Sequence, residues 1–186
     1  MLRFASRVGA RPLALTLVAL GSTLAACADR APTAATPTAA AAASNAAAGN
    51  AGYHATLATL RRATARYHDL KAALDDDFVF LHGCEVREEG GPVGTVYVNF
   101  ERLTDGRIDP SLPDALIYEP TADGRLRLVG VELAEPNTGQ AAPRFLGHTF
   151  QEEDEFGVYG LHAWVWSENP NGMFAETNPR VSCGVE

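Results

Sequence analysis

Two side chains in the C-terminal half of this 186-residue chain, Glu132 and His162, have types suited to proton transfer or metal binding. Each stands in an apolar run that alternates as a β-strand does, 126–134 and 158–166. A carboxylate in such a run is costly unless it is paired or lies in a wet cleft. If Glu132 and His162 point to the same side of a sheet, they form a carboxylate–imidazole pair. That pair would suit proton transfer, two ligands of a metal, or a structural hydrogen bond.

Aromatic residues surround this pair in the sequence pattern. The alternation in 158–166 places His162 on the same strand face as Trp164 and Trp166. Other strand-like runs contribute Tyr97 and Tyr118. We therefore predict a ligand cleft on the sheet face opposite the helix, lined by Tyr97, Tyr118, Glu132, His162 and Trp164. The alternative is that these residues belong to the core or to an ordinary surface.

The sequence lacks the motifs of well-known catalytic sites. It contains no Gly-x-Ser-x-Gly, His-Glu-x-x-His, P-loop or dinucleotide fingerprint. We therefore expect no cofactor, assign no catalytic residue, and favour a binding role over an enzymatic one. His68 would join a site only if the end of its helix overhangs the sheet. The acid run 152–155 is typical of a solvated face, because it lacks the spaced ligands and turn glycine of a calcium loop.

The elements that must position these side chains follow from the hydrophobic pattern. Apolar residues in 55–74 recur at spacings of three and four, which predicts an amphipathic helix; they are Leu57, Leu60, Ala63, Tyr67, Leu70 and Leu74. Turn-rich segments separate five strand-like runs, which are 78–81, 93–99, 115–119, 126–133 and 158–166. The segment 143–156 is ambiguous and is compatible with a loop containing one helical turn.

The order of these elements predicts the fold class. The segment 118–125 has the composition of a hairpin connection between antiparallel strands. No second long helical pattern lies between the strands, so parallel crossovers are not expected. We predict an α+β fold in which one long N-terminal helix packs on a mainly antiparallel, curved sheet of about five strands.

The first 26 residues have the pattern of a signal peptide. Three arginines precede the apolar run 13–20, which is far shorter than the roughly 20 residues that span a bilayer. The residues Leu24-Ala25-Ala26-Cys27 resemble the lipobox of bacterial lipoproteins. This resemblance implies cleavage before Cys27, diacylglycerol on its sulfur and an acyl chain such as palmitate on the new N-terminus. The alternative is an ordinary signal peptide followed by an unmodified cysteine.

The remaining chain divides into a tether and a body. Residues 27–52 are rich in Ala, Pro and Thr and contain no large apolar side chain, so they cannot form a core and predict a disordered tether. The length of the segment 53–186 predicts a single domain. We expect this domain to lie outside the cytoplasm, by default on the outer membrane facing the periplasm. The net charge of −8 speaks against nucleic acid as a partner. The expected partners are the membrane, through the lipid, and a small molecule or an envelope protein.

The three cysteines allow one disulfide if Cys27 carries lipid. In an oxidising compartment Cys84 and Cys183 are then predicted to pair. Free thiols are the alternative. A metal site built on both thiols has less support, because the sequence contains no Cys-x-x-Cys pair.

The body also resembles, as a whole, a group of exported bacterial proteins without an assigned activity. The segments that carry the resemblance are 65–69, 94–99, 115–120, 128–132 and the tail 169–183 with its two Asn-Pro pairs. That group often has a histidine where this chain has Val96. The resemblance implies a common fold and one disulfide, and it transfers no function.

These observations lead to three functional hypotheses. We favour a lipid-anchored cell-envelope binding module that takes a small molecule or a partner in the aromatic cleft. The first alternative is a metal-dependent or acid/base enzyme that uses Glu132 and His162. The second is a structural or interaction lipoprotein of the envelope.

Overall fold

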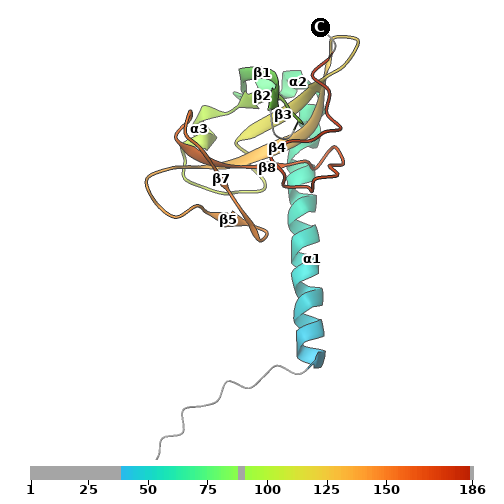
Figure 1. The fold of residues 1–186 in the computed structure, drawn as a ribbon, viewed down its shortest axis with the longest axis vertical. Helices are drawn as coiled ribbons and strands as arrows, with labels where there is room; N and C mark the ends of the chain where they lie inside the picture. Colours follow the sequence, from blue (N-terminus) through green and yellow to red (C-terminus); the bar gives the residue numbers. More distant parts are fainter. Residues whose placement is uncertain (1–38, 88–90, 185–186) are drawn as a thin grey trace, which may run out of the picture. The chain divides into compact units, whose positions relative to one another are not determined.

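The computed structural model describes residues 39–87 and 91–184, and these residues form an α+β body (Figure 1). The predicted α+β class and the mainly antiparallel sheet are therefore confirmed. The predicted signal peptide, the lipid on Cys27 and the first part of the tether lie outside the described residues. The helix α1 begins at Ala39, within the segment for which we predict the tether. None of the helices in the described ranges has the length and apolarity that a membrane crossing needs.

An antiparallel sheet of six strands forms the body, in the order β1-β2-β3-β4-β8-β7. The strands are β1 (Val79–Arg87), β2 (Gly91–Val98), β3 (Ala115–Pro120), β4 (Leu126–Pro136), β7 (Gln151–Glu153) and β8 (Val158–Ala163). The two short strands β5 (Arg144–Phe145) and β6 (His148–Thr149) pair separately. All five predicted strands are present, and the pattern misses the short strands β5, β6 and β7. The predicted hairpin joins β3 to β4, with Gly124 in the left-handed region at φ 76°.

The helical segment is broken where the sequence predicts one long helix. The α1 helix (Ala39–Thr64) is followed by the 3₁₀ helix η1 (Ala65–His68) and the short α2 (Leu70–Leu74). Asp69 interrupts the pattern because its backbone is extended and its carboxylate accepts a hydrogen bond from the Lys71 amide, which caps α2. One further short helix, α3 (Phe100–Leu103), follows β2.

The two faces of the sheet bury different clusters. On the face that we call the helix face, α1 and η1 pack against the strands; its buried residues include Leu57, Leu60, Tyr67, Leu116, Tyr118, Val131, Leu133 and Leu161. On the other, which we call the tail face, the buried residues include Val93, Val96, Val98, Ile117, Val129, Trp164 and Val181. In the tail, residues 164–184, Trp164 and Val181 pack on this second face, whereas Val165, Trp166, Met173 and Phe174 pack against the cluster of the helix face.

Two local irregularities change which side chains share a face. The register of β3 against β4 shifts between Ile117 and Tyr118, which leaves Val129 as the extra residue of a β-bulge. Val129 therefore joins the tail face and Leu128 joins the helix face, so the alternation predicted for 126–134 is wrong at these positions. The strand β8 ends at Ala163, and Trp166 packs on the helix face rather than beside Trp164.

The disulfide predicted between Cys84 and Cys183 is present. It joins β1 to the end of the tail across a sequence separation of 99 residues. The tail is also held by hydrogen bonds from the Asn178 amide to the Pro92 carbonyl (3.0 Å) and from the Ser182 amide to Glu119 (2.8 Å). The C-terminal segment is thus a structural part of the sheet's cover.

Candidate functional site

Glu132 and His162 meet as the sequence predicts. They are directly opposite residues on the paired strands β4 and β8. The Oε2 atom of Glu132 lies 3.9 Å from Nε2 of His162, and the two residues are only 7% and 5% exposed. The pair is therefore real, but it sits at the base of the tail face rather than on an open surface.

The predicted cleft loses its two tyrosines. Tyr97 pairs with Leu116, which pairs with Val131. Glu132 follows Val131 in the strand, so its side chain points to the opposite face.

Tyr97 and Tyr118 instead make an edge-to-face contact on the helix face, with ring centroids 5.5 Å apart. The Tyr118 hydroxyl donates to the Tyr67 carbonyl at 2.8 Å, and burial raises the pKa of Tyr118. These contacts make both tyrosines part of the core that docks η1.

Trp164 does lie near the pair. Its ring makes an edge contact with the His162 ring at a centroid distance of 6.0 Å. Its Nε1 donates to the Ala175 carbonyl of the tail at 2.6 Å, and the ring is 2% exposed. Trp164 therefore holds the tail over the site, and little of its ring is left for a ligand.

A third ionisable residue, Glu153, completes the site, and sequence reasoning missed it. It belongs to β7, which pairs with β8 on the side away from β4. The carboxylates of Glu132 and Glu153 and the imidazole of His162 each offer a ligand atom, and these atoms lie within 4.8 Å of one another. Glu153 stands in the acid run interpreted as a solvated face. That interpretation holds for Glu152, Asp154 and Glu155, which are exposed, but not for Glu153, which is partly buried on the edge strand 151–153. The ambiguous segment 143–156 thus contains short strands that were not predicted, with a turn at 154–157.

Gly160 makes room for the two carboxylates to meet. It stands on β8 two residues before His162, opposite Ala134 on one side and Gln151 on the other. A Cβ atom at this position would lie less than 3.0 Å from an oxygen of Glu132 and from one of Glu153. Both carboxyl groups therefore occupy the space above Gly160 that any other residue would fill.

Burial sets the protonation of the cluster. Desolvation raises the pKa of Glu132 well above its usual range, and the neighbouring charge of Glu153 raises it further. Desolvation also raises the pKa of Glu153, and the hydrogen bond from Glu132 opposes that shift. The two carboxyl groups are therefore coupled, and burial favours a proton on Glu132 that is donated in a hydrogen bond to Glu153.

His162 is neutral at the same pH, and its tautomer follows from its contacts. Desolvation lowers its pKa to about 4, with the positive charges of Arg87 and His82 adding to the effect. Its Nδ1 lies 2.6 Å from the Glu176 carbonyl oxygen. Because a carbonyl only accepts, Nδ1 carries the hydrogen and Nε2 presents a lone pair towards Glu132.

A hollow of about 220 Å³ opens beside this cluster. The strands contribute Glu153, Gly160 and His162 to its lining, and the tail contributes residues 174–176. Glu176 also forms an ion pair with Arg87 of β1. The tail thus supplies one wall of the hollow and the carbonyl that orients the imidazole.

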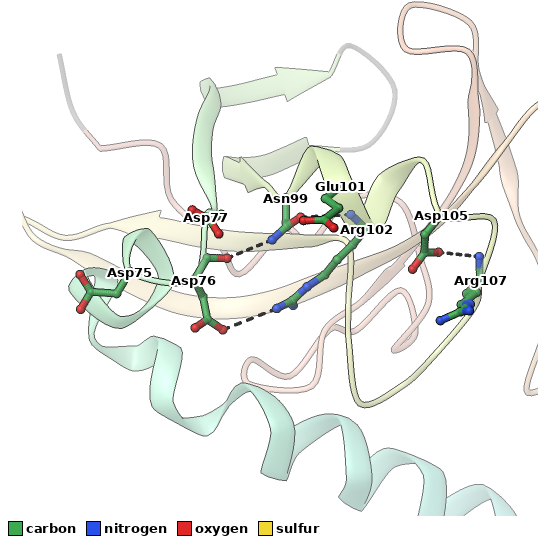
Figure 2. Close-up of a pocket in the computed structure, with 8 residues that line it drawn as sticks. All are labelled: Asp75, Asp76, Asp77, Asn99, Glu101, Arg102, Asp105 and Arg107. Carbon is green, nitrogen blue, oxygen red and sulfur yellow. Dashed lines mark hydrogen bonds and ion pairs between the residues drawn. The ribbon is translucent and has the colours of Figure 1, made fainter.

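A larger hollow, of about 560 Å³, lies between α2 and α3 (Figure 2). It is lined by Asp75, Asp76, Asp77, Asn99, Glu101, Arg102, Asp105 and Arg107. The contacts of Asp76 are structural. Its carboxylate accepts a hydrogen bond from the Tyr67 hydroxyl at 2.6 Å and forms an ion pair with Arg66. The carboxylate also pairs with Arg102, and the backbone carbonyl of Asp76 accepts a hydrogen bond from Asn99 (Figure 2). The arrangement joins the helical segment to β2 and α3, and we assign it no ligand.

His68 lies far from this cluster in the fold. Its ring packs edge-on against Trp166 at 4.5 Å on the helix face. It therefore does not join Glu132 and His162.

Comparisons of the chain with protein-family models, with curated proteins and with solved structures find no match.

Proposed function

We propose that the protein is a lipid-anchored cell-envelope protein whose body binds a small ligand in the hollow beside His162. One observation carries this proposal. Glu132, Glu153 and the neutral imidazole of His162 form one cluster, and Glu153 and His162 line the hollow beside it, on a sheet face that otherwise buries mainly apolar side chains.

The energetic cost of this arrangement supports a functional role. Burying a carboxyl group or an imidazole costs free energy that an apolar side chain of similar size would not. Glu132 and His162 are both nearly sealed from solvent. Clusters of ionisable groups with strongly shifted pKa values, placed beside a hollow, are typical of binding and catalytic sites.

The volume of the hollow restricts the ligand. Pockets for drug-sized molecules enclose about 300–1,000 Å³, whereas this hollow encloses about 220 Å³. The ligand is accordingly an ion or a molecule of few heavy atoms.

Two features support the location. The residues Leu24-Ala25-Ala26-Cys27 have the pattern of a lipobox. The disulfide between Cys84 and Cys183 is of a kind that persists in oxidising compartments such as the periplasm. We place the anchor in the outer membrane, with the body facing the periplasm.

The anchor is tested by metabolic labelling with a palmitate analogue in a bacterial host. The wild-type chain should take up label and sediment with membranes, because several acyl chains hold a protein far more firmly than one. Cys27→Ser should remain unlabelled and stay in the soluble periplasmic fraction. Equal labelling of both chains would refute lipid attachment at Cys27.

The ligand site is tested by thermal shift against a panel of divalent ions, small carboxylates, amines and inorganic phosphate. At least one compound should raise the melting temperature of the wild-type chain, because a ligand that binds only the folded state stabilises it. Ala175→Leu fills the hollow from the tail and should abolish the shift. Ala141→Leu, on the exposed surface, is the matched control. A shift that survives Ala175→Leu would place binding elsewhere.

Acid–base catalysis is a second candidate, and the opposite pKa shifts of Glu132 and His162 favour it. Burial favours the protonated form of the Glu132 carboxyl group and the unprotonated form of the His162 imidazole, which are the states of a general acid and a general base. A panel of chromogenic ester, phosphate and glycoside substrates tests it. Turnover that is lost in Glu132→Gln would support this candidate, and absence of turnover on every substrate class would oppose it.

A further inference from the structure

We infer that the ligand of this hollow is a divalent transition-metal ion, held by Glu132, Glu153 and Nε2 of His162. The inference rests on the proposed function, because it names the ligand of the same hollow. The nitrogen and oxygen donors come from three neighbouring strands, β4, β7 and β8. Ligands on paired strands hold their positions better than ligands on loops.

The spacing of the donor atoms fits a single ion. Ligand atoms bonded to zinc at about 2.0–2.2 Å lie at most about 4.4 Å apart. The donor atoms here lie within 4.8 Å of one another. The ligand atoms of a tetrahedral zinc lie about 3.5 Å apart, so the carboxylate groups must turn inwards by up to about 1 Å at their oxygens for all three residues to bind one ion.

The imidazole is already oriented as a ligand. Histidines that bind metals usually donate their other ring N–H to a carbonyl or carboxylate, which fixes the tautomer. His162 does this through Nδ1, which donates to the Glu176 carbonyl. Within the described residues Nε2 makes no hydrogen bond, since its 3.9 Å approach to Glu132 is too long for one. The ring is thus a buried donor with its lone pair unused.

The charge of the cluster favours a divalent cation over a monovalent one. With both carboxyl groups ionised the cluster carries a charge of −2, because the imidazole is neutral. A divalent cation brings the buried site to zero net charge, which removes the penalty for burying like charges together. The charge of Arg87 lowers the pKa of both carboxyl groups, but its guanidinium is also paired with Glu176, so it offsets the charge of the cluster only in part.

Gly160 is the residue whose lack of a side chain makes the site possible. The oxygens of Glu132 and Glu153 fill the volume that a Cβ atom would take. Neither carboxylate makes a hydrogen bond to Gly160 itself. The glycine therefore provides the space in which the two carboxylates come close enough to bind one ion.

The donor set narrows the class of metal. Calcium takes six to eight oxygen ligands and magnesium keeps most of its water. One imidazole and two carboxylates suit zinc, manganese or iron(II) instead. The hollow leaves room at the open side for one or more waters, so the coordination shell need not be closed by protein.

The inference is tested on the full-length chain in detergent, stripped with a chelator and titrated with Zn²⁺ by calorimetry. We expect one equivalent to bind. Glu153→Gln should weaken binding at least about 100-fold, because even residues that only orient ligands cost 10–100-fold. Glu152→Gln is the matched control: it is the same change on the neighbouring residue, whose side chain points to the other face. Its affinity should equal that of the wild type.

A second pair of variants keeps all three ligands in place. Gly160→Ala puts a methyl group between the carboxylates and should also weaken binding at least tenfold. Gly83→Ala, where an added Cβ meets nothing within 4 Å, should leave the affinity unchanged. Circular dichroism checks that each variant is folded.

The possible results separate the two proposals. Zn²⁺ binding that is equal in Glu153→Gln and Glu152→Gln would overturn the metal site. So would the absence of Zn²⁺ and Mn²⁺ binding to the folded wild type. If an organic compound from the thermal-shift panel then binds in the hollow, the proposed function stands without the metal. If no compound binds, both proposals fail.

Discussion

Asp114 shows how burial alone changes the chemistry of a single residue in this protein. It is 1% exposed and its carboxylate accepts a hydrogen bond from the Ala134 amide at 2.8 Å. Desolvation nevertheless raises its pKa to about 7, with the charge of Asp105 adding to the shift and that of Arg102 opposing it. Asp114 is therefore half protonated near neutral pH.

This shift gives a pH dependence of known sign. The folded state binds the Asp114 proton more tightly than the unfolded state does, so its contribution is fully present below about pH 4 and is lost as the pH rises to about 7. Relative to Asp114→Asn, the free energy of unfolding of the wild type should fall by about 2–4 kcal/mol over this range. Urea denaturation at a series of pH values measures the difference. A difference that is constant with pH would contradict the assignment.

Asp76 differs from Asp114, because its carboxylate has positively charged partners. Its carboxylate accepts a hydrogen bond from the Tyr67 hydroxyl and forms ion pairs with Arg66 and with Arg102, of which Figure 2 shows the one with Arg102. Asp76→Asn should therefore cost about 1–3 kcal/mol of the free energy of unfolding. Asp75→Asn breaks only an exposed pair with Lys71 and should cost under about 0.5 kcal/mol. Equal losses of unfolding free energy in the two variants, measured by denaturation, would show that the contacts of Asp76 do not stabilise the fold.

The residue scale also shows where sequence reasoning succeeds and where it stops. Glu132 and His162 could be paired in advance, because each is a polar residue in an apolar strand. Glu153 could not, since it stands in a run of four acids that resembles solvated surface. Only the pairing of β7 with β8 turns its side chain towards the site.

At the scale of elements, turn residues and alternation are sufficient to locate the main strands. Turn residues and alternation do not predict the bulge at Val129 or the end of β8 at Ala163. Both depend on neighbouring strands, and each moves later side chains to the other face. This is why Leu128 and Trp166 lie on the helix face.

The docking of the helical segment gives a prediction at the same scale. Leu60 is fully buried against the sheet, whereas Leu74, predicted to lie on the same stripe, is 50% exposed. Leu60→Ala should lower the free energy of unfolding by about 2–5 kcal/mol, because it leaves a cavity under α1. Leu74→Ala should change it by less than about 0.5 kcal/mol. Similar values for both, measured by thermal or urea denaturation, would contradict this docking.

At the scale of the whole described body, the tail both covers part of the sheet and forms one wall of the site. It contacts β8 through Trp164, β2 through Asn178 and β1 through the disulfide at Cys183. Glu176 lies within this segment and orients His162. The pairing of the two cysteines was predictable, because few pairings were possible. The tail's role as one wall of the site was not, since its sequence contains mainly turn residues.

The disulfide should be a large part of the stability of the protein. It closes a loop of about 100 residues, which the chain-entropy description values at about 4–5 kcal/mol, against a typical total of about 5–15 kcal/mol. Replacing Cys84 and Cys183 by alanine should lower the midpoint of guanidinium denaturation accordingly. Reductant should destabilise the wild type and leave the double variant unchanged. A loss below about 1 kcal/mol would contradict this prediction.

The central claim is that Glu132, Glu153 and His162 form one metal site, and anomalous diffraction at the zinc edge tests it most directly. Crystals of the zinc-loaded protein should give a peak about 2.0–2.2 Å from Nε2 of His162 and from an oxygen of each glutamate. A peak only at surface histidines, or an empty site with the two carboxyl groups hydrogen-bonded to each other, would contradict the account.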